Sequence, residues 1–187
     1  IILLGFFLTN VQIGIYSVAL DLITKAAIVP ETIMTYLLPK FSVAKNDSRL
    51  LISNSIKLIF TTNLLFFFGL IFFGKEIIVF LFSNEFEAAY GISVIIFLGF
   101  CVRTVSRVFE VYLLGKNRPE IVSVAFLLSF LSHLLCIFIL VPLYKDYDAA
   151  IAVSFSFLVN SIVLIYFYME QAKFQSERNV INLSCRK

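Results

Sequence analysis

The chain has 187 residues, of which 60% are hydrophobic and 14% are charged, with a net charge of +3 and a mean hydropathy of +0.98. A soluble domain is about 45–50% apolar and about 25% charged, so a soluble fold of this length would leave much apolar surface exposed. This excludes an ordinary soluble domain, and the continuous apolar runs exclude the alternating strands of a membrane β-barrel. We predict an all-α, polytopic bundle of transmembrane helices.

The apolar segments succeed one another along the chain, and a helix needs about 20 apolar residues to cross a bilayer. Residues 1–8 are predicted to be the end of one span. Five full spans follow, at 11–38, 57–73, 88–115, 120–141 and 149–168. Pro30 should kink the first of these five spans. The apolar run 77–82 is too short to cross, so 74–87 are predicted to form an amphipathic helix at the membrane surface.

Residues 1–169 therefore form one predicted transmembrane bundle, and 170–187 form a polar tail. The chain opens on Ile1 within an apolar run and shows no signal peptide, which indicates that an N-terminal part is missing.

The lysines and arginines outside the spans predict the orientation of the bundle, because short cytoplasmic loops carry an excess of them. With the C-terminus in the cytoplasm, the cytoplasmic segments are 39–57, 116–119 and 170–187. These hold ten basic residues, namely Lys40, Lys45, Arg49, Lys57, Lys116, Arg118, Lys173, Arg178, Arg186 and Lys187. The outer loops hold two, Lys75 and Lys145. The bias predicts a multi-pass protein of the cytoplasmic (inner) cell membrane with a cytoplasmic C-terminus.

Charged side chains inside the predicted spans are the candidate functional groups, since such charges usually face a bundle interior or a watery cavity. Asp21 and Lys25 are four residues apart and can neutralise each other on one helical face. Arg103, Arg107 and Glu110 form one helical stripe with a net positive charge. Guanidinium groups bind phosphate through paired hydrogen bonds, so this stripe is predicted to bind an anion.

Structural alternatives stay open for both groups of charges. Asp21 and Lys25 could form a purely structural ion pair, and the two arginines could extend towards the cytoplasmic end of their helix. Asp21 and Glu110, the deep acidic residues, are candidates for coupling or charge pairing.

The sequence carries no pattern typical of an enzyme or a metal site. It has one histidine, no Gly-rich phosphate loop and no metal-ligand spacing, and its three cysteines show no pairing pattern. We therefore predict a protein that is not an enzyme, with no catalytic residue, metal or cofactor and no nucleic-acid partner.

Several motifs resemble a known transporter family. They are the stretch 11–19 followed by 38–42, the run 77–82 followed by 86–89, and 141–144 followed by 149–152. Together they resemble the polysaccharide-export flippases, the O-antigen and teichoic-acid type translocases of the multidrug/oligosaccharidyl-lipid/polysaccharide superfamily. Residues 145–148 depart from the family, because Lys, Asp, Tyr and Asp replace its usual glycines there.

The resemblance implies two six-helix bundles around a central cavity, of which this chain would supply most of the second. It implies an alternating-access flippase that moves an undecaprenyl-pyrophosphate-linked oligosaccharide to the outer leaflet. Arg103 and Arg107 would then hold the pyrophosphate, with Lys25 as a third candidate. The expected partners are this lipid-linked oligosaccharide, membrane lipid, and a polysaccharide polymerase with other assembly proteins.

Other functions remain open on the sequence. They are a multidrug/cation antiporter of the same superfamily, a membrane-embedded polysaccharide polymerase, and an inactive truncated product.

Overall fold

The computed structural model describes residues 2–6, 8–43, 48–144 and 147–184, and these residues form helices without any strand. The elements are η1 (Ile2–Phe6), α1 (Asn10–Ala26), α2 (Ile28–Val43), α3 (Ser48–Phe82), η2 (Asn84–Phe86), α4 (Ala89–Gly115), α5 (Pro119–Tyr144) and α6 (Asp148–Ser184). Four of the described helices are long and apolar enough to cross a membrane, and α1 with α2 makes a fifth if the bent pair is one span. The prediction of an all-α polytopic bundle is therefore confirmed.

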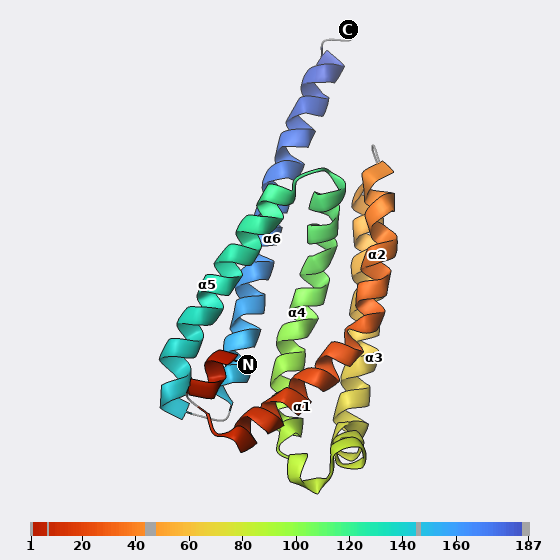
Figure 1. The fold of residues 1–187 in the computed structure, drawn as a ribbon. Helices are drawn as coiled ribbons and strands as arrows, with labels where there is room; N and C mark the ends of the chain where they lie inside the picture. Colours follow the sequence, from red (N-terminus) through yellow and green to blue (C-terminus); the bar gives the residue numbers. More distant parts are fainter. Residues whose placement is uncertain (1, 7, 44–47, 145–146, 185–187) are drawn as a thin grey trace.

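Helix α4 lies at the centre of the bundle. Figure 1 shows it between α5 and α6 on one side and α2 and α3 on the other, with α1 crossing near its lower half. It packs against all five other α-helices. Its lower part joins one buried apolar cluster through Ile96 and Phe97, and its upper part joins a second through Val108 and Tyr112. The middle of α4 therefore has neighbouring helices on most of its faces, while Leu98 and Val102 remain exposed.

The kink predicted at Pro30 is confirmed. Helices α1 and α2 meet at Ala27 with a bend of 42°. A proline has no N–H to donate four residues back, and its ring clashes with that carbonyl, which here belongs to Ala26. Regular hydrogen bonds continue on either side, from Ala27 N to Ile23 O and from Glu31 N to Ala27 O, both 3.0 Å. The break therefore falls one turn before the proline.

Small residues bring α4 and α6 close together. A Cβ added to Gly99 would lie 2.6 Å from Ser154 Cα, a separation that real Cβ atoms do not show. Ser154 Oγ donates to the carbonyl of Ile95 at 3.0 Å across the same interface. Ala149, Ala150 and Ala152 at the start of α6 are fully or almost fully buried. Without a hydrophobic force between helices in lipid, this kind of close packing and hydrogen bonding stabilises a bundle.

Several predicted boundaries differ from the observed ones. The partial span at 1–8 contains the short 3-10 helix η1. Helix α3 begins nine residues before the predicted span at 57–73 and runs without a break to Phe82, so 74–82 are not a separate helix. At 1.5 Å per residue α3 is about 50 Å long, which exceeds the roughly 30 Å of a bilayer core. Figure 1 shows its last turns viewed nearly end-on, in a direction different from the rest of the helix.

The basic segments predicted to be cytoplasmic share one end of the bundle. Figure 1 places the end of α2, the start of α3, the connection from α4 to α5 and the extension of α6 at the upper end. Helix α6 continues to Ser184, so most of the predicted polar tail is helical. At the opposite end Lys75 pairs with Glu87 at 2.7 Å. Four of the basic residues used for the orientation lie outside the described residues, namely Lys45, Lys145, Arg186 and Lys187.

We expect Gly99→Ala to destabilise the bundle by about 1–3 kcal/mol, because the added methyl group overpacks the interface with α6. Gly69→Ala is the matched control, since a Cβ there meets nothing within 4 Å. Alanine favours a helix by up to about 1 kcal/mol over glycine, so the control should be neutral or stabilising. Thermal unfolding of the intact protein in detergent measures both, and equal midpoints for the two variants would contradict the close packing.

Candidate functional site

The stripe predicted on α4 forms one connected ion-pair network. Arg103 Nη1 lies 3.0 Å from Glu110 Oε2, and Arg107 Nη1 lies 3.2 Å from Glu110 Oε1. Glu110 therefore accepts from both arginines, one through each carboxylate oxygen. The side chains of Arg103 and Glu110 are only 14% and 5% exposed. The structure thus brings together the three residues that spacing alone had placed on one face.

Two other helices complete the surroundings of Arg103. Its Nη1 donates to Asn160 Oδ1 of α6 at 2.7 Å. Its guanidinium carbon lies 5.1 Å from the ring centroid of Phe126 on α5, a distance at which a cation is attracted to the face of an aromatic ring. Neither partner was predicted, because residues on different helices have no spacing rule in the sequence that connects them.

Arg107 connects the network to α2. Its Nη2 lies 2.6 Å from Glu31 Oε2, and the two side chains are 26% and 45% exposed. Asp21 and Glu110 were the acidic residues predicted to lie deep in the spans, and Glu31 is a further carboxylate that reaches the arginine stripe. The sequence does single out Glu31, because this acidic residue lies inside the predicted span 11–38 and directly follows Pro30.

The network is electrically neutral, with two guanidinium groups facing two carboxylates. The net positive charge expected for the stripe is therefore compensated by Glu31. The physical reason is the cost of an uncompensated charge in a low-dielectric interior, which is several kcal/mol per ion. An anion can reach the arginines only by competing with a carboxylate that already occupies them.

The ion pair of Arg103 with Glu110 and the ion pair of Arg107 with Glu31 differ in how deeply they are buried. Breaking a buried ion pair by removing one partner costs about 3–5 kcal/mol, because the remaining charge stays uncompensated. Exposed pairs are worth about 0–1 kcal/mol. Arg103 with Glu110 belongs to the first class, and Arg107 with Glu31 is the less buried of the two pairs. The pair between α4 and α2 is therefore the one that a movement between helices can separate.

The network also holds unused hydrogen-bond donors. Among the described residues, neither Arg107 Nε nor Asn160 Nδ2 has an acceptor, although both atoms are buried. Buried donors without partners are uncommon in folded proteins and cost about 1–3 kcal/mol each. Both are the kind of N–H group that binds a phosphate oxygen.

Lys25 and Asp21 form the ion pair that their spacing predicted, with Lys25 Nζ donating to Asp21 Oδ2. This pair is separate from the α4 network, and both of its side chains are largely exposed. Lys25 borders an apolar cavity of about 430 Å³ between α1, α3 and α4, beside Phe66, Phe73 and Phe97. The structure therefore does not bring Lys25 to the two arginines.

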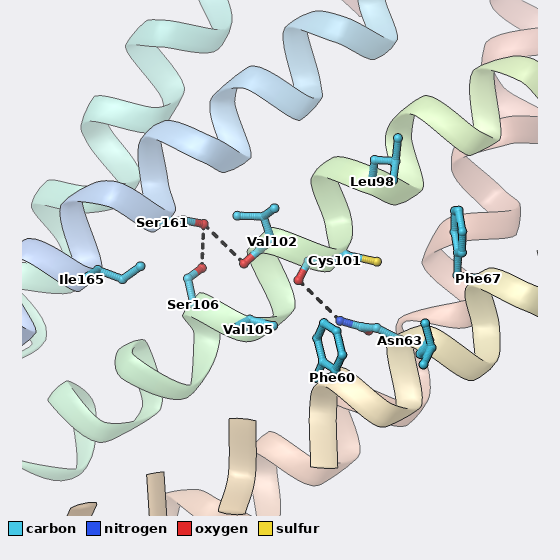
Figure 2. A pocket seen from close by; sticks show the side chains of 11 residues that line it. Phe60, Asn63, Phe67, Leu98, Cys101, Val102, Val105, Ser106, Ser161 and Ile165 are labelled. Atoms are coloured by element: carbon cyan, nitrogen blue, oxygen red, sulfur yellow. Dashed lines mark hydrogen bonds between the residues drawn. The ribbon is translucent and has the colours of Figure 1, made fainter. Parts of the chain in front are cut away.

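A second apolar groove, of about 410 Å³, lies between α3, α4 and α6. Figure 2 shows Phe60, Phe67, Leu98 and Ile165 around it. Its polar lining is already used between helices. Asn63 Nδ2 donates to Thr104 Oγ1 at 2.7 Å, and Ser161 Oγ lies 2.8 Å from Ser106 Oγ, joining α4 to its neighbours on either side. Neither of the two cavities is lined by Arg103 or Arg107.

Within the described residues, no group of three or more His, Cys, Asp or Glu side chains could hold a metal ion. The chemistry that the α4 network can offer is the binding of a charged group by hydrogen bonds and by charge. An oxyanion suits the guanidinium and amide donors, and no nucleophile–base pair accompanies them among these residues.

We expect Arg103→Gln to lower the free energy of unfolding by about 3 kcal/mol, the lower end of the range for a broken buried pair, because Arg107 still contacts Glu110. The double variant Arg103→Gln, Glu110→Gln should recover most of that loss, since no buried charge is then left over. Arg118→Gln is the control in an exposed ion pair and should change stability by less than about 1 kcal/mol. Thermal unfolding in detergent gives the three values, and an additive loss in the double variant would show that the two charges do not interact.

No protein-family profile matches the chain, and no solved structure matches it. Over 166 residues the chain is 26% identical to the "Probable low-salt glycan biosynthesis flippase Agl15" of Haloferax volcanii. The alignment covers 86% of this chain and 35% of that relative, so the chain spans about a third of the relative's length. The similarity supports a flippase-like family, and together with the apolar helices it indicates a multi-pass membrane protein that resembles a transporter rather than an enzyme.

Proposed function

We propose that the protein is a flippase that carries a lipid-linked oligosaccharide, held by its pyrophosphate, across the cytoplasmic membrane by alternating access. The substrate class comes from the resemblance to the polysaccharide-export flippases and from the similarity to the probable glycan biosynthesis flippase of Haloferax volcanii. An undecaprenyl-pyrophosphate carrier with an O-antigen or related surface-polysaccharide unit is the proposed form. The arginine pair on α4 is the observation that carries the proposal.

The depth of the arginines supports a transport site. Arg103 is twelve residues from Gly115, the last residue of α4, which is about 18 Å at 1.5 Å per residue. It therefore lies close to the middle of a helix that is long enough to cross the bilayer. Substrate sites of secondary transporters lie near the bilayer midplane. A charge retained there in spite of its cost is a functional group by default.

Arg103 and Arg107 would bind the pyrophosphate from neighbouring turns of one helix. Two guanidinium groups offer the forked, paired donors that match phosphate oxygens, and the spare Nε of Arg107 and Nδ2 of Asn160 add two more. Glu110 would keep both arginines aligned between transport cycles. The oligosaccharide would occupy the aqueous space beside the bundle while the lipid tail stays in the bilayer.

The proposed orientation places the upper end of the bundle in Figure 1 in the cytoplasm. That end carries Lys40, Arg49, Lys116 and Arg118, as positive-inside topology requires. A polysaccharide polymerase and other assembly proteins are the proposed partners on the outer side, where the flipped unit would be used.

A multidrug/cation antiporter is less well supported by the same network. Such a carrier needs a carboxylate that is free to bind a cation. Both oxygens of Glu110 accept from arginines, and Asp21 is paired with Lys25.

The test replaces both arginines together with Glu110, the most buried carboxylate of the network, so that only the more exposed Glu31 keeps its charge. We expect Arg103→Gln, Arg107→Gln, Glu110→Gln in the intact protein to reduce surface polysaccharide by about 100-fold or more, since each hydrogen bond to a charged group is worth about 1.5–3 kcal/mol. Surface polysaccharide and membrane protein level are measured together, with Arg118→Gln as the control that should transport normally. Normal polysaccharide in the triple variant would refute the assigned role, and a gain or loss of cationic-drug resistance alone would favour the antiporter.

A further inference from the structure

The two arginines differ in exposure and in the helix that supplies their outer partner. Arg103 is in contact with Glu110, Asn160 and Phe126 and is 14% exposed. Arg107 is the more exposed arginine, at 26%, and its Nη2 pairs with Glu31 of α2, which is 45% exposed. The pair of Arg107 and Glu31 is therefore the more accessible part of the network.

Glu31 is fixed to a different helix from its partner, and that helix begins at a break. Glu31 lies on the first turn of α2, four residues after Ala27, where the chain bends by 42°. Glu110 lies on the same helix as both arginines, so it remains with them whatever α2 does. Of the two carboxylates in the network, only Glu31 can leave Arg107 through a displacement of another helix relative to α4.

We infer that Glu31 is an internal competitor for the anion site, a residue that occupies Arg107 when no substrate is bound and that drives release of the pyrophosphate by returning to it. The inference rests on the proposed function, because it names the residue that regulates the same site. A tethered carboxylate acts at an effective concentration in the millimolar range or above, so a weakly bound free anion does not displace it. Pyrophosphate can displace it because it carries several charges and can contact both arginines at once.

Release is as necessary for a carrier as binding. A transport site must bind well enough to load and weakly enough to unload. Without Glu31, two arginines and a buried amide donor would bind a multiply charged anion tightly, because opposite charges attract more strongly where the dielectric constant is low. Glu31 restores neutrality as the anion leaves, so neither state exposes an unpaired guanidinium group.

The experiment measures binding and transport on the same variants of the intact protein. Inorganic pyrophosphate is the binding probe, titrated by calorimetry into detergent-solubilised protein. Glu31→Gln should bind pyrophosphate more tightly by about 5- to 150-fold, the usual range of coupling between two ligands of one protein. Its surface polysaccharide should nevertheless fall, because release becomes slow. Tighter binding with slower transport is a combination that a merely structural defect does not produce.

Glu120→Gln is the matched control, since it removes the carboxylate of another ion pair, formed with Arg118 at 3.3 Å. It should change neither binding nor transport. Glu31→Asp keeps the negative charge on a side chain that is one methylene group shorter, so it should tighten pyrophosphate binding by a smaller factor. It replaces Glu31→Gln in the experiment if that variant does not fold.

The outcomes separate the two proposals. If wild-type protein binds pyrophosphate and Arg107→Gln abolishes this binding, but the Glu31 variants bind no more tightly than wild type, the competitor role is refuted and the flippase site stands. If neither the wild-type protein nor Glu31→Gln binds pyrophosphate, the anion site itself is refuted and the competitor role falls with it.

Discussion

A bilayer does not solvate an isolated charge, and this constraint organises the bundle around α4. Arg103 lies near the middle of that helix, and Arg107 and Glu110 follow one and two turns further on. Each would cost several kcal/mol without partners. Their partners come from three other helices, as Glu31 of α2, Phe126 of α5 and Asn160 of α6. The helix that carries the charges must therefore be the one that the others surround, and α4 contacts every other α-helix.

The polar network in turn depends on how closely the helices approach. Lipid tails are as apolar as leucine side chains, so contact area between helices and interhelical hydrogen bonds decide the packing. Gly99 lets α6 approach α4 until Ser154 reaches the carbonyl of Ile95. Two turns further along α6 from this contact, the short side chain of Asn160 can reach Arg103. A wider interface would separate the two groups and leave the buried Asn160 Oδ1 without its hydrogen bond from Arg103.

The sequence predicted those features that depend on residues close together along one helix. The stripe of Arg103, Arg107 and Glu110 and the pair of Asp21 and Lys25 follow from helical spacing, and the kink follows from Pro30. The bounds of α4 follow from its apolar length. The contact of Arg107 with Glu31 joins residues 76 positions apart, and no rule of spacing connects them. The unbroken course of α3 past residue 73 was missed because Lys75 and Glu76 were taken as the end of an apolar span, whereas a helix continues through charges wherever it leaves the bilayer core.

The position of the apolar groove limits where the proposed lipid-linked substrate could bind. The groove is lined by Val102, Val105 and Ser106, which are turned away from Arg103 and Arg107 by the 100° step of the helix. Between the groove and the arginines runs the interface of α4 with α6, closed by the contact of Ser106 with Ser161 (Figure 2). A single lipid cannot place its pyrophosphate at the arginines and its tail in this groove without separating these helices. In the proposed transport role, the tail of a substrate bound at the arginines would therefore leave the site away from this groove, past Glu31 of α2 or Phe126 of α5.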